Sequence, residues 1–153
     1  FRGANIFEGY LDDPEKTAAA FRDGWFVTGD LGRFDDDGFL FIEGRLSRFS
    51  KIGGEMVPHG TIEQKIVELF ELDQSEAYVA IVMGVPDAVK GETLVLLATR
   101  DFTVAEVRER LLGDGVTALW VPRVIHRVDK IPVLGTGKLD LKECKRLAVE
   151  AVA

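Results

Sequence analysis

Lys138 is the residue of this chain whose position most clearly indicates chemistry. It ends the loop at 135–138 (GTGK), where glycines let the backbone approach a ligand and the lysine supplies a cation on a flexible stem. Such a cation suits negative charge that develops on a phosphate or a carboxylate. The loop is not a Walker A motif, because Pro132 and Leu139 occupy the places of that motif's first glycine and its Ser or Thr. Taken alone, it is more often an ordinary turn before a helix.

Two further motifs precede this loop. Residues 24–32 have the sequence GWFVTGDLG, and residues 44–58 have the sequence GRLSRFSKIGGEMVP. In this order and spacing, the three motifs resemble those of the adenylate-forming ligase superfamily, whose members include acyl-CoA synthetases, luciferases and the adenylation domains of peptide synthetases. The resemblance extends over nearly the whole chain, since it begins at residues 2–11 (RGANIFEGYL).

A narrower resemblance rests on residues 49–57, 90–96 and 119–123. They are similar to the acyl-ACP synthetase part of the bifunctional 2-acylglycerophosphoethanolamine acyltransferase/acyl-ACP synthetases. The reaction implied is attack of a fatty carboxylate on the α-phosphate of ATP, followed by attack of a carrier thiol on the acyl-adenylate. Acyl-carrier protein is the favoured acceptor. A long-chain acyl-CoA ligase and a non-catalytic, lid-like interaction domain are the alternatives.

The resemblance assigns three residues to the chemistry. It implies that Lys138 is the catalytic cation of adenylation, and that Asp30 and Arg45 bind the nucleotide. Asp30 would accept hydrogen bonds from both ribose hydroxyls, because a carboxylate offers two acceptor oxygens. The alternatives are a turn aspartate at Asp30 and a surface salt bridge at Arg45. A pure binding module needs none of the three, so their joint presence argues against the non-catalytic alternative.

The resemblance also implies a hinge at 44–47, with Gly44 and Ser47 as its candidate pivots. Glycine lowers the torsional cost of such motion, and hinges absorb motion at a few residues. The family commonly has Asp or Lys at the position of Ser47, so Leu46 or Gly44 is an alternative pivot. The small domain beyond the hinge would adopt one orientation for adenylation and another for thioester formation.

Gly53 and Gly54 match the glycines past which the pantetheine arm of the acceptor would slide. Their simpler interpretation is a β-turn before Glu55, and the two interpretations are compatible. Glu55 and Glu63 match acidic positions that brace the small domain, so we expect them to be structural.

The predicted fold class is α+β. Residues 1–43 are expected to be the end of a large N-terminal domain, including a hairpin at its edge. Residues 44–47 are the hinge, and residues 48–153 are a mobile C-terminal lid domain with a mixed sheet and helices. The family's Ser/Thr/Gly-rich phosphate loop is not found among the 153 residues. We therefore expect an inactive C-terminal fragment of a longer enzyme, whose ATP and Mg²⁺ are bound mainly by the N-terminal domain.

The net charge, the cysteine count and the lengths of the apolar runs limit which classes of partner the chain can have. The net charge of −7 argues against nucleic acid and against an anionic membrane surface. The lone Cys144 excludes an internal disulfide and suits a reducing cytosol, and no apolar run reaches the length of a membrane span. The expected partners are a fatty acid, acyl-carrier protein or CoA, and the N-terminal domain. The expected location is cytoplasmic, with attachment to the inner membrane through upstream domains as an option. His59 and His126 have no second ligand at metal spacing, so no metal site is predicted.

Docking of an acidic carrier protein would need a basic patch. Two clusters offer one, and solvated surface is the equal alternative for both. They are Arg45, Arg48 and Lys51, and Arg123, Arg127 and Lys130.

Local patterns predict the elements that position these residues. Asp13 and Pro14 indicate the start of a helix that would end at Gly24. Asp37-Gly38 indicates the turn of a hairpin between residues 31–34 and 39–42. Further strands are predicted over 77–85, 92–99 and 121–128. Capping boxes at Thr61–Gln64 and Thr103–Glu106 predict the starts of two further helices. A last helix is predicted over 140–152.

Overall fold

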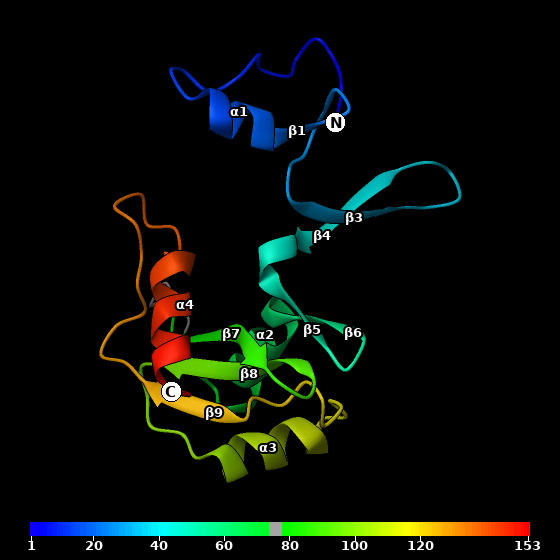
Figure 1. The fold of residues 1–153 in the computed structure, drawn as a ribbon. Helices are drawn as coiled ribbons and strands as arrows, with labels where there is room; N and C mark the ends of the chain where they lie inside the picture. The colour runs from blue at the N-terminus through cyan, green and yellow to red at the C-terminus, as the bar shows by residue number, and fades with distance from the viewer. Residues whose placement is uncertain (74–77) are drawn as a thin grey trace. The chain divides into compact units, whose positions relative to one another are not determined.

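The computed structural model describes residues 1–73 and 78–153 (Figure 1). Ala77, where a strand was predicted to begin, lies outside the described residues. The chain divides into two compact units, Phe1–Ser47 and Arg48–Ala153. The described residues form four α-helices and several small sheets, so the α+β prediction is confirmed. The assignment of the boundary region as a mobile hinge stays a prediction.

The first unit contains one short helix and two hairpins. Its elements are α1 (Pro14–Ala20), β1 (Phe21–Arg22), β2 (Trp25–Phe26), β3 (Asp30–Phe34), β4 (Leu40–Arg45) and the 3₁₀ helix η1 (Leu46–Arg48), whose last residue belongs to the second unit. Asp13 caps α1 by accepting a hydrogen bond from the Lys16 N–H at 2.9 Å, and Pro14 is the first helical residue, as predicted. The hairpin of β3 and β4 is antiparallel and closes through Gly38, also as predicted.

The predicted end of α1 at Gly24 is wrong. The helix ends at Ala20, and the chain continues directly into the hairpin of β1 and β2. Asp23 and Gly24 have φ angles of 51° and 77° and form the two-residue turn of that hairpin. Two successive left-handed residues match the right-handed twist of the flanking strands. Asp-Gly therefore directs a hairpin here rather than a helix cap.

The second unit is built on a three-stranded mixed sheet. A hairpin of β5 (Phe49–Ile52) and β6 (Glu55–Pro58) leads into α2 (His59–Leu69), and the sheet has the order β7 (Ala80–Asp87), β8 (Gly91–Ala98), β9 (Val124–Arg127). Strands β7 and β8 are antiparallel, whereas β8 and β9 are parallel. The remaining helices are α3 (Val104–Gly113) and α4 (Leu141–Glu150).

Alternating residues of the sheet supply two separate cores. Val82, Leu94 and Leu96 pack with α2 and α3, whereas Met83 and Val95 pack with α4. Because successive side chains of a strand point to opposite faces, both faces of the sheet are covered. Figure 1 shows α4 and α3 on different sides of β7, β8 and β9. This layered arrangement holds the loops at the ends of the strands in fixed positions.

Two capping predictions have different outcomes. Thr103 caps α3 by accepting a hydrogen bond from the Glu106 N–H at 3.1 Å, as predicted. The predicted cap at Thr61 is wrong, because α2 begins at His59 with Pro58 at the N-cap and no side-chain capping bond. The accompanying contact is tertiary: the His59 side chain is buried against Ser50 of β5, and the helix start lies three residues upstream of the predicted one.

The two C-terminal elements are shorter than predicted. β9 covers 124–127 rather than 121–128, since Pro122 has no N–H to donate to a ladder. The last helix covers 141–150, and Asp140 is its N-cap, accepting a hydrogen bond from the Glu143 N–H. Among the described residues, no helix combines the length and the apolar character needed to cross a membrane.

Candidate functional site

Lys138 lies at the end of a tight loop that precedes α4. An isolated β-bridge joins Val133 to Leu139, and the Leu134 N–H donates to the Lys138 carbonyl at 2.7 Å. The Gly137 N–H donates to the Leu134 carbonyl at 2.8 Å, and Gly137 has a φ of 81°. The backbone of Lys138 is thus pinned while its side chain is exposed. The predicted turn before a helix is therefore present, and the role of Lys138 as the catalytic cation stays a prediction.

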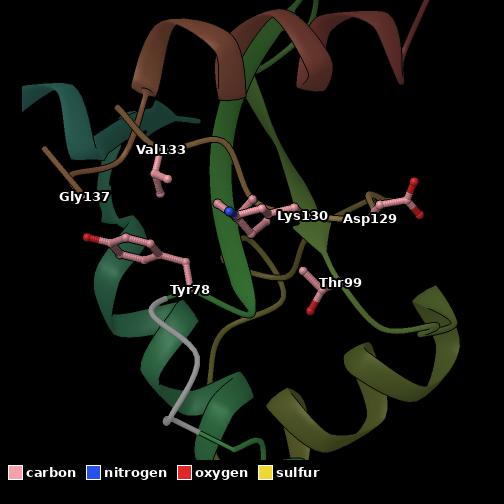
Figure 2. A pocket seen from close by; sticks show the side chains of 7 residues that line it. Tyr78, Thr99, Asp129, Lys130, Val133 and Gly137 are labelled. Atoms are coloured by element: carbon pink, nitrogen blue, oxygen red, sulfur yellow. The ribbon is translucent and has the colours of Figure 1, made fainter. Parts of the chain in front are cut away.

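A cavity of about 510 Å³ lies at the base of this loop (Figure 2). Figure 2 shows Val133 and Gly137 of the loop above Tyr78 in this view. The lining residues are Tyr78, Thr99, Asp129, Lys130, Ile131, Val133 and Gly137. Lys138 is not among them, and its side chain is exposed to solvent.

Asp30 and Arg45 lie side by side on the hairpin of β3 and β4. They are Cα partners in the antiparallel register, and Arg45 Nε is 2.9 Å from Asp30 Oδ1. A second guanidinium nitrogen of Arg45 donates to the Thr28 carbonyl at 2.9 Å. The surface salt bridge considered for Arg45 is therefore present, and as an exposed pair it contributes at most about 1 kcal/mol of stability. The structure brings the two predicted nucleotide ligands together, and their binding role stays a prediction.

The predicted hinge at 44–47 comprises the last four residues of the first unit. Gly44 has a φ of 153°, which side-chain-bearing residues rarely adopt. Ser47 lies in η1, a short 3₁₀ turn of the kind that commonly connects two elements. The Leu46 N–H donates to the Gly29 carbonyl at 2.8 Å, which ties the start of η1 to the first unit.

Gly53 and Gly54 form the turn between β5 and β6, with φ angles of 57° and 94°. The Gly53 N–H donates to the Lys90 carbonyl at 3.0 Å, which fixes the turn to the connection between β7 and β8. No described heavy atom lies within 4 Å of the position that a Cβ would take at Gly54. The predicted turn is present, and its use as a pantetheine path stays a prediction.

Glu63 and Glu55 make the structural contacts expected of them. Glu63 forms a two-pronged ion pair with Arg48, and it also accepts a hydrogen bond from the Val82 N–H at 2.6 Å. Arg48 donates in turn to the Val82 carbonyl at 3.2 Å. Glu55 accepts a hydrogen bond from the Trp120 indole at 3.2 Å. We call Arg48, Glu63 and Val82 the β7 clamp, because they fix the first residue of the second unit to strand β7.

Neither of the two predicted basic clusters keeps all of its side chains free for docking. Arg45 and Arg48 are engaged in the ion pairs with Asp30 and Glu63, so the first cluster does not form a free patch. In the second cluster, Arg127 pairs with Asp101 at 3.2 Å. Arg123 and Lys130 line two different cavities. A carrier-docking patch made of either complete cluster is therefore not supported.

His59 belongs to a buried polar pair that local sequence signals did not reveal. Its Nε2 lies 2.9 Å from Ser50 Oγ, and the side chain is 2% exposed. Burial, followed by the charges of Arg48 and Lys145, lowers the pKa of His59 to about 3. The expectation of a non-ligand role fits these contacts, and among the described residues no group of three potential metal ligands gathers.

The low pKa of His59 predicts a loss of stability in acid. In the unfolded chain the His59 imidazole is protonated below about pH 6.5, whereas in the folded chain it is protonated only below about pH 3. Stability should therefore fall as the pH is lowered from about 6.5 towards 3, by up to about 1.4 kcal/mol per pH unit from this group. Urea unfolding at several pH values measures the slope. His59→Gln should reduce it; equal slopes in wild type and His59→Gln would contradict the prediction.

Comparisons with known proteins were made for the whole chain. No protein-family model matches it. It is 37% identical over 143 residues to a probable CoA ligase, CCL9, of Humulus lupulus, covering 91% of this chain and 26% of that protein. It is 33% identical over 145 residues to a 2-succinylbenzoate–CoA ligase of Listeria monocytogenes, covering 94% and 30%. The chain thus spans less than a third of the length of these relatives.

Solved structures agree with the sequence relatives. ATP-bound MatB from Rhodopseudomonas palustris superposes with a TM-score of 0.72 at 32% identity, over 95% of this chain and 29% of that one. The O-succinylbenzoate coenzyme A synthetase MenE from Bacillus subtilis, in complex with AMP, superposes with a TM-score of 0.67 at 25% identity, over 94% and 29%. This agreement in sequence and fold supports the assignment of the chain to the C-terminal domain of the adenylate-forming CoA ligase superfamily.

Proposed function

We propose that this chain is the C-terminal part of an ATP-dependent fatty acid ligase with two half-reactions. In the first, a carboxylate oxygen of the fatty acid attacks the α-phosphorus of ATP, and pyrophosphate leaves. In the second, the sulfur of a carrier thiol attacks the acyl carbon, the thiol loses its proton, and AMP leaves. The observation that carries the proposal is Lys138: an exposed cation on a backbone-pinned loop, in a chain similar to CoA ligases.

Lys138 acts in the first half-reaction. Charge accumulates on the oxygens around phosphorus during the attack, and a positioned cation stabilises it. The hydrogen bonds of residues 134 and 137 hold the loop before substrate arrives, so little reorganisation is needed at the moment of reaction. The same cation also attracts the carboxylate, which brings the two reactants together.

Asp30 and Arg45 hold the nucleotide in this proposal. The carboxylate of Asp30 accepts hydrogen bonds from the ribose hydroxyls. Arg45 orients that carboxylate through its contact at 2.9 Å, and it is itself positioned by the Thr28 carbonyl. Mg²⁺ accompanies ATP in such chemistry. The proposal places its ligands mainly in the N-terminal domain, and Mg²⁺ is usually held by one or two carboxylates together with the phosphates of the substrate.

For the second half-reaction, Lys138 must move away from the acyl-adenylate and the carrier thiol must reach the acyl carbon. A change of torsion at 44–47 reorients the second unit, and the Gly53–Gly54 turn then lies along the path of the pantetheine arm. Acyl-carrier protein is the acceptor that we favour, because of the similarity at 49–57, 90–96 and 119–123. CoA is the alternative, favoured by the names of the relatives. A non-catalytic lid-like domain is less well supported, since it has no use for Lys138.

The 153-residue chain by itself should not activate fatty acids. It lacks a Ser/Thr/Gly-rich phosphate loop, and a lid cannot orient ATP and a fatty acid without the surface that it closes upon. ATP–pyrophosphate exchange with the purified chain and a long-chain fatty acid is expected to remain at background. The chain carrying Lys138→Ala is the matched control. Exchange clearly above that control would overturn the interpretation of the chain as a dependent part of a larger enzyme.

A further inference from the structure

The loop that carries Lys138 has two legs, and hydrogen bonds join them at its base. The Asp140 N–H donates to the Pro132 carbonyl at 3.0 Å, and the isolated β-bridge joins Val133 to Leu139, one residue further along each leg. Residues 132–140 therefore form a closed loop, and Lys138 lies only two residues before its end. A change in the direction of the chain at Asp140 is thus passed directly to Lys138.

Asp140 is also the N-cap of α4, which the loop enters directly (Figure 1). Its Oδ1 accepts a hydrogen bond from the Glu143 N–H at 3.0 Å, and its carbonyl accepts one from the Cys144 N–H at 2.9 Å. Its φ of −85° and ψ of 84° lie outside the helical region, as is usual for an N-cap. The N–H of Asp140 therefore binds the base of the loop, while its carboxylate and carbonyl bind the helix.

The helix α4 gives this junction a fixed support. Cys144 of α4 is fully buried in the same core as Ile131, the residue that precedes the first leg of the loop. Lys145 adds a polar contact, because its ammonium group donates to the Gly84 carbonyl of β7. Both legs consequently rest on one core, the first through Ile131 and the second through Asp140 and α4.

The bonds inside the loop do not replace this support. The Leu134 N–H donates to the Lys138 carbonyl and the Gly137 N–H donates to the Leu134 carbonyl, which sets the shape of the loop but not its direction relative to α4. Without an acceptor at the N-cap, an N–H group of the first turn loses its partner and the start of the helix is destabilised. The charge of Lys138 lies at the end of a four-carbon stem, so a small change of angle at the base displaces it.

We propose that Asp140 is a positioning residue for adenylation. By capping α4, its carboxylate fixes the direction from which Lys138 approaches the α-phosphate and the fatty carboxylate. The inference rests on the proposed function and deepens it, since the position of the catalytic cation then depends on a second residue that touches neither substrate. The second half-reaction does not use Lys138, so the effect of Asp140 is confined to the first.

The test is Asp140→Ala in the full-length enzyme, with the two half-reactions measured separately. Single-turnover formation of acyl-adenylate should slow by at least about tenfold, since misplacement of a reacting group by about 1 Å costs up to about 100-fold. The loss should persist at saturating ATP and fatty acid, because stabilisation of the transition state is reduced rather than binding. Transfer from pre-formed acyl-adenylate should stay within about twofold of wild type. Equal slowing of both half-reactions would overturn the proposal.

Thr103→Ala is the matched control for the loss of a helix cap. Thr103 caps α3 in the same way, by accepting a hydrogen bond from the Glu106 N–H at 3.1 Å. Removal of either cap should lower the free energy of unfolding by a similar amount, which urea unfolding measures. Adenylation by Thr103→Ala should nevertheless stay within about twofold of wild type, since α3 packs in the other core. Equal slowing of adenylation in the two variants would assign the effect to stability and overturn the positioning role.

Asp140→Asn separates the cap from the charge. Asparagine keeps an acceptor oxygen for the Glu143 N–H and is about as good an N-cap as aspartate, but it has no charge. Adenylation by Asp140→Asn should therefore return to within about threefold of wild type. An Asp140→Asn enzyme as slow as Asp140→Ala would show that the charge acts rather than the cap, and would overturn the proposal.

Lys138→Ala, measured in the same series, distinguishes a failure of this inference from a failure of the proposed function. Slow adenylation in both Lys138→Ala and Asp140→Ala, with normal transfer, supports the positioning role. If only Lys138→Ala is slow, the ligase mechanism stands and the role of Asp140 is overturned. If Lys138→Ala forms acyl-adenylate at the wild-type rate, the proposed function fails, and the positioning role fails with it.

Discussion

Lys138→Ala should slow acyl-adenylate formation in the full-length enzyme by about 100- to 1000-fold, the usual consequence of removing one preorganised group that stabilises transition-state charge. The substitution leaves the loop intact, because the bonds that pin it are backbone bonds of residues 134, 137 and 138. The Lys138 side chain is exposed, so its removal opens no cavity in the core. Single-turnover formation of acyl-adenylate measures the effect on this step alone.

The matched control is Lys142→Ala, which removes an exposed lysine of α4 and leaves the loop unchanged. It should leave adenylation within about twofold of wild type, as expected for a surface change away from the reacting groups. Transfer from pre-formed acyl-adenylate to the carrier thiol should also be little affected by Lys138→Ala. If Lys138→Ala slows both half-reactions equally, Lys138 is not specific to one orientation, and the alternating mechanism loses its main support.

The parts of the fold that could be predicted depend on neighbours in sequence. Asp13 and Thr103 cap helices through N–H groups only three residues away, so their type and spacing were sufficient. The apolar runs of β7 and β8 indicated strands covered on both faces, as the two cores confirm. Asp23-Gly24 has the same local signal as a helix end and as a hairpin turn. The pairing of Phe21 with Phe26 decides between them, and that is a contact across the turn.

Motifs provided candidate site residues, whereas contacts between distant segments could not be predicted from any local pattern. The motifs pointed to Lys138, Asp30 and Arg45, and the fold does place Asp30 and Arg45 together. No local pattern indicates that Arg108 of α3 shares a cavity with Lys90, because the two residues meet only after the sheet and α3 have packed. The same limit applies to Ser50 and His59, nine residues apart and joined through a hairpin.

The β7 clamp limits where the two units can pivot. Arg48 is held by Glu63 and by the Val82 carbonyl, and the side chains of Arg48 and Glu63 are 16% and 14% exposed. Because this part-buried ion pair is reinforced by two hydrogen bonds to Val82, motion that pulls the Arg48 side chain away from Glu63 is unfavourable. The hydrogen bond from the Leu46 N–H to Gly29 restrains the other side. Rotation with both anchors intact therefore concentrates at the link between them, which favours Ser47 over Gly44 as the pivot.

Ser47→Pro should consequently separate the half-reactions in the sense opposite to Lys138→Ala. Proline fixes φ near −65°, a value compatible with the 3₁₀ turn in which Ser47 lies. It also disfavours helical torsions at the preceding residue, Leu46, which is the first residue of the same turn, so it restricts the link, and the amide spectrum of the variant reports whether it is folded. If the orientation that proline fixes is the one for adenylation, adenylation survives and thioester formation falls by at least about 100-fold, since misplacement of a reacting group by about 1 Å costs that much.

Ser47→Ala is the matched control, because it removes the hydroxyl while leaving the torsions of the link free. It should support both half-reactions, which would show that the loss in Ser47→Pro comes from the backbone and not from the side chain. The two half-reactions are measured separately, by single-turnover formation of acyl-adenylate and by transfer from pre-formed acyl-adenylate. A Ser47→Pro enzyme with both rates close to those of Ser47→Ala would exclude a pivot at Ser47 and move it to Gly44, where the backbone already has a φ of 153° that favours glycine.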